Sequence, residues 1–268
     1  DENDTLNVQY YFTRFEEADR QFQLTCGMND AIAGARRVRH ARFHKELRTG
    51  DLISIRSFVA FDGPHMLTVV HEMYNTSSGQ LAATAIDGYA PAASSAKVLR
   101  TRFKDVQDPM PEQANPRGIN ASPAGARPTL EAVLSSDARI CFRGTVLPRH
   151  IGGDGRVDDN FAVAAFAEGM PHIWEQTPMN HAYLAENNFG RTVAEMKLTW
   201  LSPLKAGDMV LVASAPTGSQ DKSFTLRHHL FESRTKRLVA ICDVVAMMID
   251  LDTRKAVELP EKDLARLP

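Results

Sequence analysis

The strongest constraint on this chain is an internal repeat, because residues 47–83 and 204–240 align without a gap, 157 positions apart. Eight positions are identical: Leu47/Leu204, Gly50/Gly207, Asp51/Asp208, Ser57/Ser214, Thr68/Thr225, His71/His228, Leu81/Leu238 and Ala83/Ala240. Self-similarity at so long an offset indicates a duplicated domain rather than a solenoid. We therefore expect two similar units packed as a pseudo-dimer, with a cleft between them.

Size and composition agree with two folded units. A length of 268 residues favours two domains, and 43% hydrophobic with 24% charged residues allows each a core. The net charge of −2 gives no general attraction to nucleic acid or membranes. No apolar run reaches about 18 residues, so no membrane span is expected. Cys26, Cys141 and Cys242 are odd in number and scattered, which favours free thiols and a cytoplasmic location.

The first copy reads as one helix followed by four strands. Apolar residues recur at helical spacing over residues 7–24, and Asn7 stands where an N-cap is expected. Strand-forming or alternating segments follow at about 36–47, 51–61, 65–74 and 80–90. The turn signal Asn-Thr-Ser-Ser-Gly at 75–79 separates the last two.

The second copy repeats this order and adds a strand. A helix is expected over residues 160–176, where Pro171 could kink or interrupt it. Strands are expected at about 139–148, 192–202, 208–216, 222–232 and 237–250. The strand before the helix has no counterpart in the first copy, because that copy begins at Asp1. We therefore expect the natural chain to carry residues before Asp1 that complete the first sheet.

The boundaries follow from these elements. Residues 1–103 form the first unit, residues 104–129 a polar linker rich in Pro and Gly, and residues 130–268 the second unit.

The segment that enters the first helix suggests a family. It carries Asp1, Asn3, Asn7 and Tyr11, with Glu16-Glu17 in the helix that follows. This pattern resembles the loop Asp-x-Asn-x-His-x-Asn-x-x-x-Tyr of hotdog-fold acyl thioesterases, the 4-hydroxybenzoyl-CoA and acyl-carrier-protein thioesterase group. The stretches 46–51 and 71–83 resemble the same family. The resemblance is closer in the first copy than in the second.

The resemblance implies an α+β fold of two tandem hotdog units, each an antiparallel sheet wrapped around a central helix. It also implies hydrolysis of an acyl thioester of coenzyme A or acyl carrier protein, with no further cofactor. Thr5 stands where many members carry His, so a mechanism that needs that His is excluded and an Asp-centred one remains. Hotdog hydratases usually carry a His-bearing loop, which is not found here. A hydratase or dehydratase, and a non-catalytic acyl-thioester sensor, remain as alternatives.

The candidate catalytic residues lie near the start of the first helix. A carboxylate there can act as base or nucleophile, and the first-turn amides can polarise the thioester carbonyl. Asp1 is the first choice, with Asn7 and Thr5 as positioning groups. Asn7 could instead serve as a helix cap alone. Glu17 is an alternative carboxylate, because some hotdog thioesterases use one from the central helix, although exposed helix charge would also explain it.

Further candidates would contact the substrate. These are Asn3, Tyr11 and His71 in the first copy and Asp154 and Asn160 in the second. Asp154 and Asn160 repeat the spacing of Asp1 and Asn7, so they could form a second or a decayed site. One working site in the first copy is the favoured arrangement. His71 lies on the apolar face of its strand, where a hydrogen-bonded core histidine is the simpler explanation.

The remaining signals mainly exclude functions. The basic run between Arg36 and Arg48 could meet coenzyme A phosphates or an acidic carrier protein, or form a solvated edge. No nucleic-acid-binding motif accompanies it. The absence of a G-x-S-x-G motif argues against an α/β-hydrolase. No metal site is expected, because His172 and His181 have no third ligand nearby in the sequence. A homo-oligomer of double-hotdog chains is also compatible with the sequence.

Overall fold

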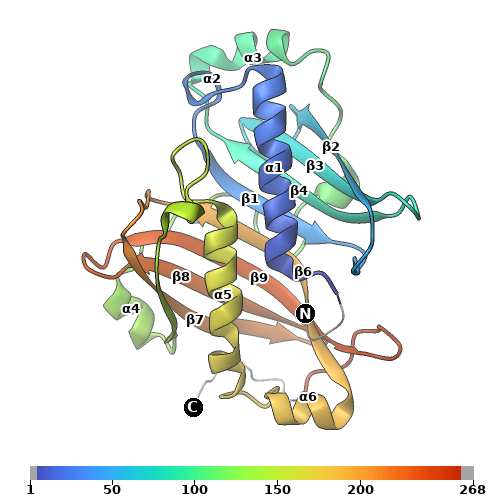
Figure 1. The fold of residues 1–268 in the computed structure, drawn as a ribbon, viewed down its shortest axis with the longest axis vertical. Coiled ribbons are helices and arrows are strands. Elements are labelled where there is room, and N and C mark those ends of the chain that lie inside the picture. Colours follow the sequence, from blue (N-terminus) through green and yellow to red (C-terminus); the bar gives the residue numbers. More distant parts are fainter. Residues whose placement is uncertain (1–4, 261–268) are drawn as a thin grey trace. The chain divides into compact units, whose positions relative to one another are not determined.

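The computed structural model describes residues 5–260, which form two compact units. The N-terminal unit contains residues 5–124 and 195–199, and the C-terminal unit contains residues 125–194 and 200–260. In each unit a long helix lies across one face of an antiparallel sheet, as Figure 1 shows for α1 and α5. The expected α+β fold of two hotdog units is confirmed.

In the N-terminal unit the sheet order is β2-β3-β4-β1-β6. The strands are β1 (Arg36–Phe43), β2 (Ile53–Ala60), β3 (Leu67–Asn75), β4 (Leu81–Tyr89) and residues 195–199 of β6 (Phe189–Trp200). The helices are α1 (Val8–Cys26), α2 (Asp30–Ala33), η1 (Ala93–Ser95), α3 (Ala96–Arg102) and η2 (Glu112–Ala114). β2 is therefore the outermost strand of this sheet.

In the C-terminal unit the sheet order is β9-β8-β7-β5. The strands are β5 (Arg139–Thr145), β7 (Met209–Gln220), β8 (Ser223–Glu232) and β9 (Leu238–Asp250), with the rest of β6. The helices are α4 (Leu130–Ser135), η3 (Pro148–His150), α5 (Asp159–Trp174) and α6 (His181–Asn187). Pro171 does not end α5, which continues to Trp174. Among the described residues, no helix is both long and apolar enough to cross a membrane.

Helix α1 has defined ends and one buried face. The Asn7 side chain accepts a hydrogen bond from the Gln9 backbone at 3.1 Å, and Gly27 ends the helix in the left-handed conformation. The buried face consists of Tyr11, Phe12, Phe15, Asp19 and Phe22, at helical spacing. This face packs on β2 and β3. A carboxylate, Asp19, thus lies within an otherwise aromatic stripe.

The segment after α3 returns along the same unit. The Val59 backbone donates to the Val106 carbonyl at 2.9 Å, and Ala114 packs under the sheet against Phe58, Val70 and Ile86. Residues 104–124, predicted as part of a linker, therefore fold with the N-terminal unit.

The repeat corresponds to one turn used twice. Gly50 and Gly207 both have φ of 92°, a left-handed conformation that glycine adopts most easily. Asp51 accepts a hydrogen bond from the Arg48 backbone at 2.8 Å, and Asp208 accepts one from the Lys205 backbone at 3.0 Å. Identical residues at these positions are thus explained by identical backbone geometry.

Replacing either turn glycine is predicted to destabilise the protein. Gly50→Ala should lower the free energy of unfolding by about 1–2 kcal/mol, because an L-residue is strained at this φ. The control is Gly125→Ala, since an added methyl there has no atom within 4 Å and φ is not left-handed. Urea unfolding of both variants tests this, and equal midpoints would contradict it.

Candidate functional site

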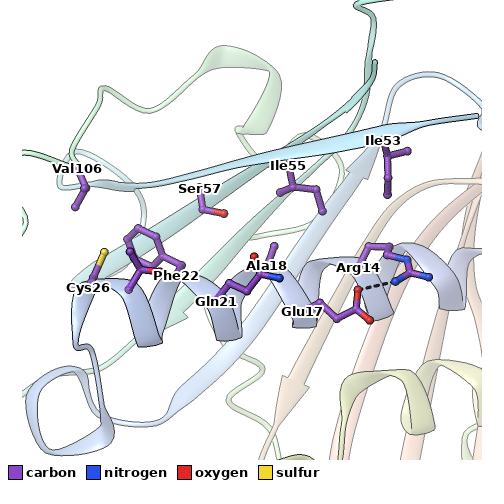
Figure 2. A pocket seen from close by; sticks show the side chains of 11 residues that line it. Arg14, Glu17, Ala18, Gln21, Phe22, Cys26, Ile53, Ile55, Ser57 and Val106 are labelled. Atoms are coloured by element: carbon purple, nitrogen blue, oxygen red, sulfur yellow. Dashed lines mark hydrogen bonds and ion pairs between the residues drawn. The ribbon is translucent and has the colours of Figure 1, made fainter. Parts of the chain in front are cut away.

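A pocket of about 450 Å³ lies between α1 and the outer strand β2 (Figure 2). Its lining residues are Arg14, Glu17, Ala18, Gln21, Phe22, Thr25, Cys26, Ile53, Ile55, Ser57 and Val106. All belong to the N-terminal unit. Apolar side chains with a few polar groups are the usual lining of a small-molecule site.

The geometry of the two elements produces this lining. Alternate residues of β2 point toward α1, while the Glu17 side chain lies along α1 beside Arg14. Alternation places Ile53, Ile55 and Ser57 on the same face of the strand. Ser57 is half-buried, so its hydroxyl lies at the boundary between the pocket and the core.

Ser57 connects the pocket to a buried histidine. Its Oγ lies 2.7 Å from His71 Nδ1, and His71 Nε2 lies 3.3 Å from Asp87 Oδ2. Ser57 and His71 are opposite each other in β2 and β3. The backbone N–H of Val59, two residues farther along β2, donates to Val106 and not to β3. Because backbone hydrogen bonding alternates along an antiparallel pair, Ser57 and His71 also form a non-hydrogen-bonded pair, in which side chains stand closest.

The carboxylate determines the histidine tautomer. A charged Asp87 can only accept hydrogen bonds, so His71 Nε2 carries a proton. A neutral imidazole then has an unprotonated Nδ1, which accepts the hydrogen bond of the Ser57 hydroxyl. The order Ser57, His71, Asp87 is therefore a directed chain of donors that ends on a charge.

Asp87 is held in its charged form by arginine. Arg39 donates to both of its oxygens, at 2.8 and 2.6 Å, and Arg36 lies 3.7 Å away. Both Asp87 and Arg39 are fully buried. Burial alone would raise the pKa of Asp87, but the two guanidinium groups and the His71 hydrogen bond hold it well below its usual range.

A second carboxylate lies beside the first. Asp19 Oδ2 lies 3.6 Å from both arginines, and Asp19 Oδ1 lies 3.9 Å from His71 Nε2. Burial and the charge of Asp87 raise the pKa of Asp19. We call Asp19, Arg36, Arg39, His71 and Asp87 the acid–histidine network.

Two further residues complete the hydrogen bonds of Asp19. Tyr89 donates its hydroxyl to Oδ1 and Gln23 donates its amide to Oδ2, both at 2.8 Å. Glu16 accepts hydrogen bonds from both arginines of the acid–histidine network, at 2.9–3.2 Å.

The acid–histidine network could be read as a metal site. Ligand atoms of Asp19, His71 and Asp87 lie within 4.8 Å of one another. However, Arg39 already occupies both oxygens of Asp87, and the two arginines supply the positive charge that a cation would bring. These donors fit a salt-bridge network better than a metal centre.

The second copy keeps the serine and histidine but not the acids. Ser214 Oγ lies 2.7 Å from His228 Nδ1 in β7 and β8, and both residues are buried. By strand register Val244 takes the place of Asp87. Phe15 and Phe166 each contact the histidine of their unit, so the two helices can be aligned on these residues. In this alignment Met170 corresponds to Asp19. Burial, followed by the charge of His229, lowers the pKa of His228 to about 3.

The structure separates the predicted residues of the first copy. Asp1 and Asn3 lie outside the described residues. Asn7 caps α1, and Thr5 is half-buried just before it. The Tyr11 hydroxyl accepts a hydrogen bond from the Leu47 backbone at 3.2 Å, and burial raises the pKa of Tyr11 to about 12.

Two predicted residues come together at the pocket. Glu17 lines it directly, and His71 reaches it through Ser57. In the C-terminal unit, Asp154 accepts a hydrogen bond from the Arg156 backbone at 3.0 Å in an exposed turn. Asn160 lies in the first turn of α5.

Three residues of this arrangement were not predicted: Ser57, Asp19 and Asp87. Ser57 was among the identical positions of the repeat, together with His71, and that pairing was an available signal. Asp19 was visible as a charged residue on the apolar stripe of a helix, where unpaired charge is rare.

One family model matches part of the chain. Residues 153–267 match the family model of the Thioesterase-like superfamily. The predicted resemblance to hotdog-fold thioesterases is therefore confirmed, although the match lies in the second copy and the predicted motif in the first. A comparison with curated proteins gives no match.

Solved structures agree on the tandem fold. A protein from Lactobacillus plantarum described as an oleoyl thioesterase is 11% identical, with a TM-score of 0.61 over 97% of this chain and 92% of its own. The 12:0-ACP thioesterase of Umbellularia californica is 9% identical, with a TM-score of 0.57 over 91% and 88%. An acyl-ACP thioesterase from Bacteroides thetaiotaomicron is 11% identical, with a TM-score of 0.56 over 92% of both chains. At these identities the likeness concerns the fold.

Removing the charge of Asp87 is predicted to be costly. Asp87→Asn should lower the free energy of unfolding by about 3–5 kcal/mol, because Arg39 would keep a buried charge without its partner. Asp243→Asn is the control, because the side chain of its partner Arg227 is 45% exposed. This substitution should cost at most about 1 kcal/mol. Similar losses of unfolding free energy for the two variants in urea would contradict the assignment of Asp87 as the buried partner of Arg39.

His228 is predicted to make stability depend on pH. Its folded pKa lies below its ordinary value of 6.5, so the unfolded state binds the proton more readily between about pH 6.5 and 3. Its contribution to stability is present above pH 6.5 and is lost as pH falls through this window. His228→Asn should flatten the decline in unfolding free energy from pH 6.5 to 4, and an unchanged slope would contradict this.

Proposed function

We propose that this chain hydrolyses an acyl thioester of coenzyme A or acyl carrier protein in the pocket between α1 and β2. The observation that carries the proposal is the tandem hotdog fold together with the thioesterase-like match of residues 153–267. Structural neighbours named as acyl-ACP thioesterases support an acyl thioester as substrate. Water and the substrate supply everything the reaction needs.

The lining of the pocket suits such a substrate. Phe22, Ile53, Ile55 and Val106 offer apolar surface to an acyl chain. Polar side chains, among them Glu17 and Ser57, lie on the two walls of the same space (Figure 2). An acyl chain can thus lie along α1 with its thioester carbonyl near a carboxylate and a hydroxyl.

Glu17 is the proposed general base for water. Its side chain is 53% exposed, and its Oε2 lies 2.6 Å from Arg14 Nη1. An exposed ion pair of this kind is weak, so it does not prevent the carboxylate from accepting a proton. Glu16 is unsuited to the role, because its carboxylate is engaged with Arg36 and Arg39. Asp1 remains the alternative base proposed from the loop motif.

Hydrolysis is tested by release of free thiol. Purified full-length protein is incubated with acetyl-, octanoyl- and palmitoyl-CoA and with an acyl carrier protein loaded with the same chains. Thiol release with at least one substrate supports a hydrolase. Binding without release would instead support a sensor and overturn the proposal, as would hydration of an enoyl thioester without thiol release.

Replacing the base is predicted to slow turnover. Glu17→Gln should lower kcat at least about 100-fold, within the usual contribution of a general base. Glu168→Gln is the matched control, because the register set by Phe15 and Phe166 makes Glu168 the counterpart of Glu17 on α5. Asp1→Asn is measured in parallel. A near-native kcat for Glu17→Gln with a large loss for Asp1→Asn would move the role to Asp1.

A further inference from the structure

Ser57 is the point at which the acid–histidine network reaches the pocket. His71, Asp87 and Arg39 are fully buried, so none of them meets a ligand directly. The Ser57 side chain points from β2 toward α1, into the space lined by Gln21 and Phe22 (Figure 2). Ser57 is the pocket-lining residue that contacts His71, so an effect of His71 and Asp87 on a substrate would pass through the Ser57 hydroxyl.

The network prepares that hydroxyl to lose its proton. His71 Nδ1 accepts the Ser57 hydrogen bond at 2.7 Å, and a proton taken up there would form an imidazolium. Its positive charge would lie beside the carboxylates of Asp87, 3.3 Å away, and Asp19, 3.9 Å away. Carboxylates at this distance stabilise an imidazolium.

We propose that Ser57 is the nucleophile of a two-step thioester hydrolysis, with His71 as its base and Asp87 as the group that orients His71. The proposal deepens the proposed function and rests on it. Serine, histidine and aspartate linked in this order can act as a nucleophile, its base and an orienting carboxylate. Here Ser57 contacts Nδ1 and Asp87 contacts Nε2, so the two ring nitrogens exchange the roles they have in the usual triad.

In the first step the Ser57 Oγ–H bond breaks and its proton moves to His71 Nδ1. The oxygen bonds to the thioester carbonyl carbon, and the carbon–sulfur bond then breaks. The imidazolium of His71 gives its proton to the leaving sulfur, so an ester of Ser57, a free thiol and a neutral His71 are formed. No oxidant or further reactant takes part.

In the second step water attacks the ester carbonyl while Glu17 accepts its proton. The bond between the acyl carbon and Ser57 Oγ breaks, and Oγ receives the proton that Glu17 took from the water, so Ser57 and Glu17 both return to their starting states. The products are a carboxylic acid and the thiol already released. Glu17 on α1 and Ser57 on β2 line the same pocket.

The second copy shows what a purely structural pair looks like. Ser214 and His228 are joined by the same 2.7 Å contact, but Ser214 is fully buried. Val244 and Met170 replace the two acids, so an imidazolium at His228 would lack the two carboxylates that lie beside His71. The chain thus holds matched controls for Ser57 and His71.

The decisive experiment traps the acyl-enzyme. Full-length Glu17→Gln and Asp1→Asn proteins are mixed with octanoyl-CoA and quenched with acid at intervals. The mass of the intact protein is measured by mass spectrometry, and the modified residue is located by peptide mapping. We expect an octanoyl adduct on Ser57, which is lost when Ser57→Ala is added and kept when Ser214→Ala is added. His71→Gln should slow adduct formation about 100-fold or more, and His228→Gln should not.

The outcomes separate this proposal from the proposed function. Thiol release by the wild-type protein without a Ser57 adduct in either variant would overturn the nucleophile and leave the hydrolase intact. An adduct that persists in the Ser57→Ala background would overturn it in the same way. If the wild-type protein released no thiol from any of the acyl-CoA or acyl carrier protein substrates, both proposals would fail.

Discussion

The bidentate pair between Arg39 and Asp87 is the interaction on which the site depends. Two fully buried charges are stable only when each is matched, and here both oxygens of Asp87 accept from one guanidinium. With Asp87 fixed as an anion, His71 is limited to one tautomer, and Ser57 becomes the donor to it. A salt bridge in the core therefore determines the chemistry of a hydroxyl at the pocket.

The duplication explains why this arrangement occurs once among the described residues. Both copies keep the turn glycine and the serine–histidine pair, because these serve the shared fold. The copies differ where Asp19 and Asp87 of the first correspond to Met170 and Val244 of the second. The histidine of the second copy thus has apolar residues at these two positions, while that of the first copy has two carboxylates. This asymmetry supports a single working site in the first copy.

Much of the fold could be predicted from periodicity. The helix at 7–24 and the strands of both copies appear within a few residues of their expected bounds, because apolar spacing reports directly on which face is buried. The cap at Asn7 was also readable, since it depends on neighbours in sequence. The predicted loop chemistry centred on Asp1 lies outside the described residues.

The site was harder to predict because it joins elements that are distant in sequence. Ser57, His71 and Asp87 lie on three strands, and their contact depends on a register that periodicity does not specify. His71 was correctly placed on a buried face, but its partners are side chains on other elements. Asp87 lies in a strand that read as small and apolar, so its role was not visible before Arg39 was seen beside it.

The most direct test of this account is the protonation state of the His71 ring, measured by two-dimensional ¹⁵N–¹H NMR of protein labelled at histidine nitrogen and assigned with His71→Gln. The account predicts a neutral ring with a protonated Nε2 and an unprotonated Nδ1 that accepts a hydrogen bond, changed by Ser57→Ala and not by Ser214→Ala. A ring protonated at Nδ1 would point the hydrogen bond the other way, and would contradict the claim that Asp87 prepares Ser57 for reaction.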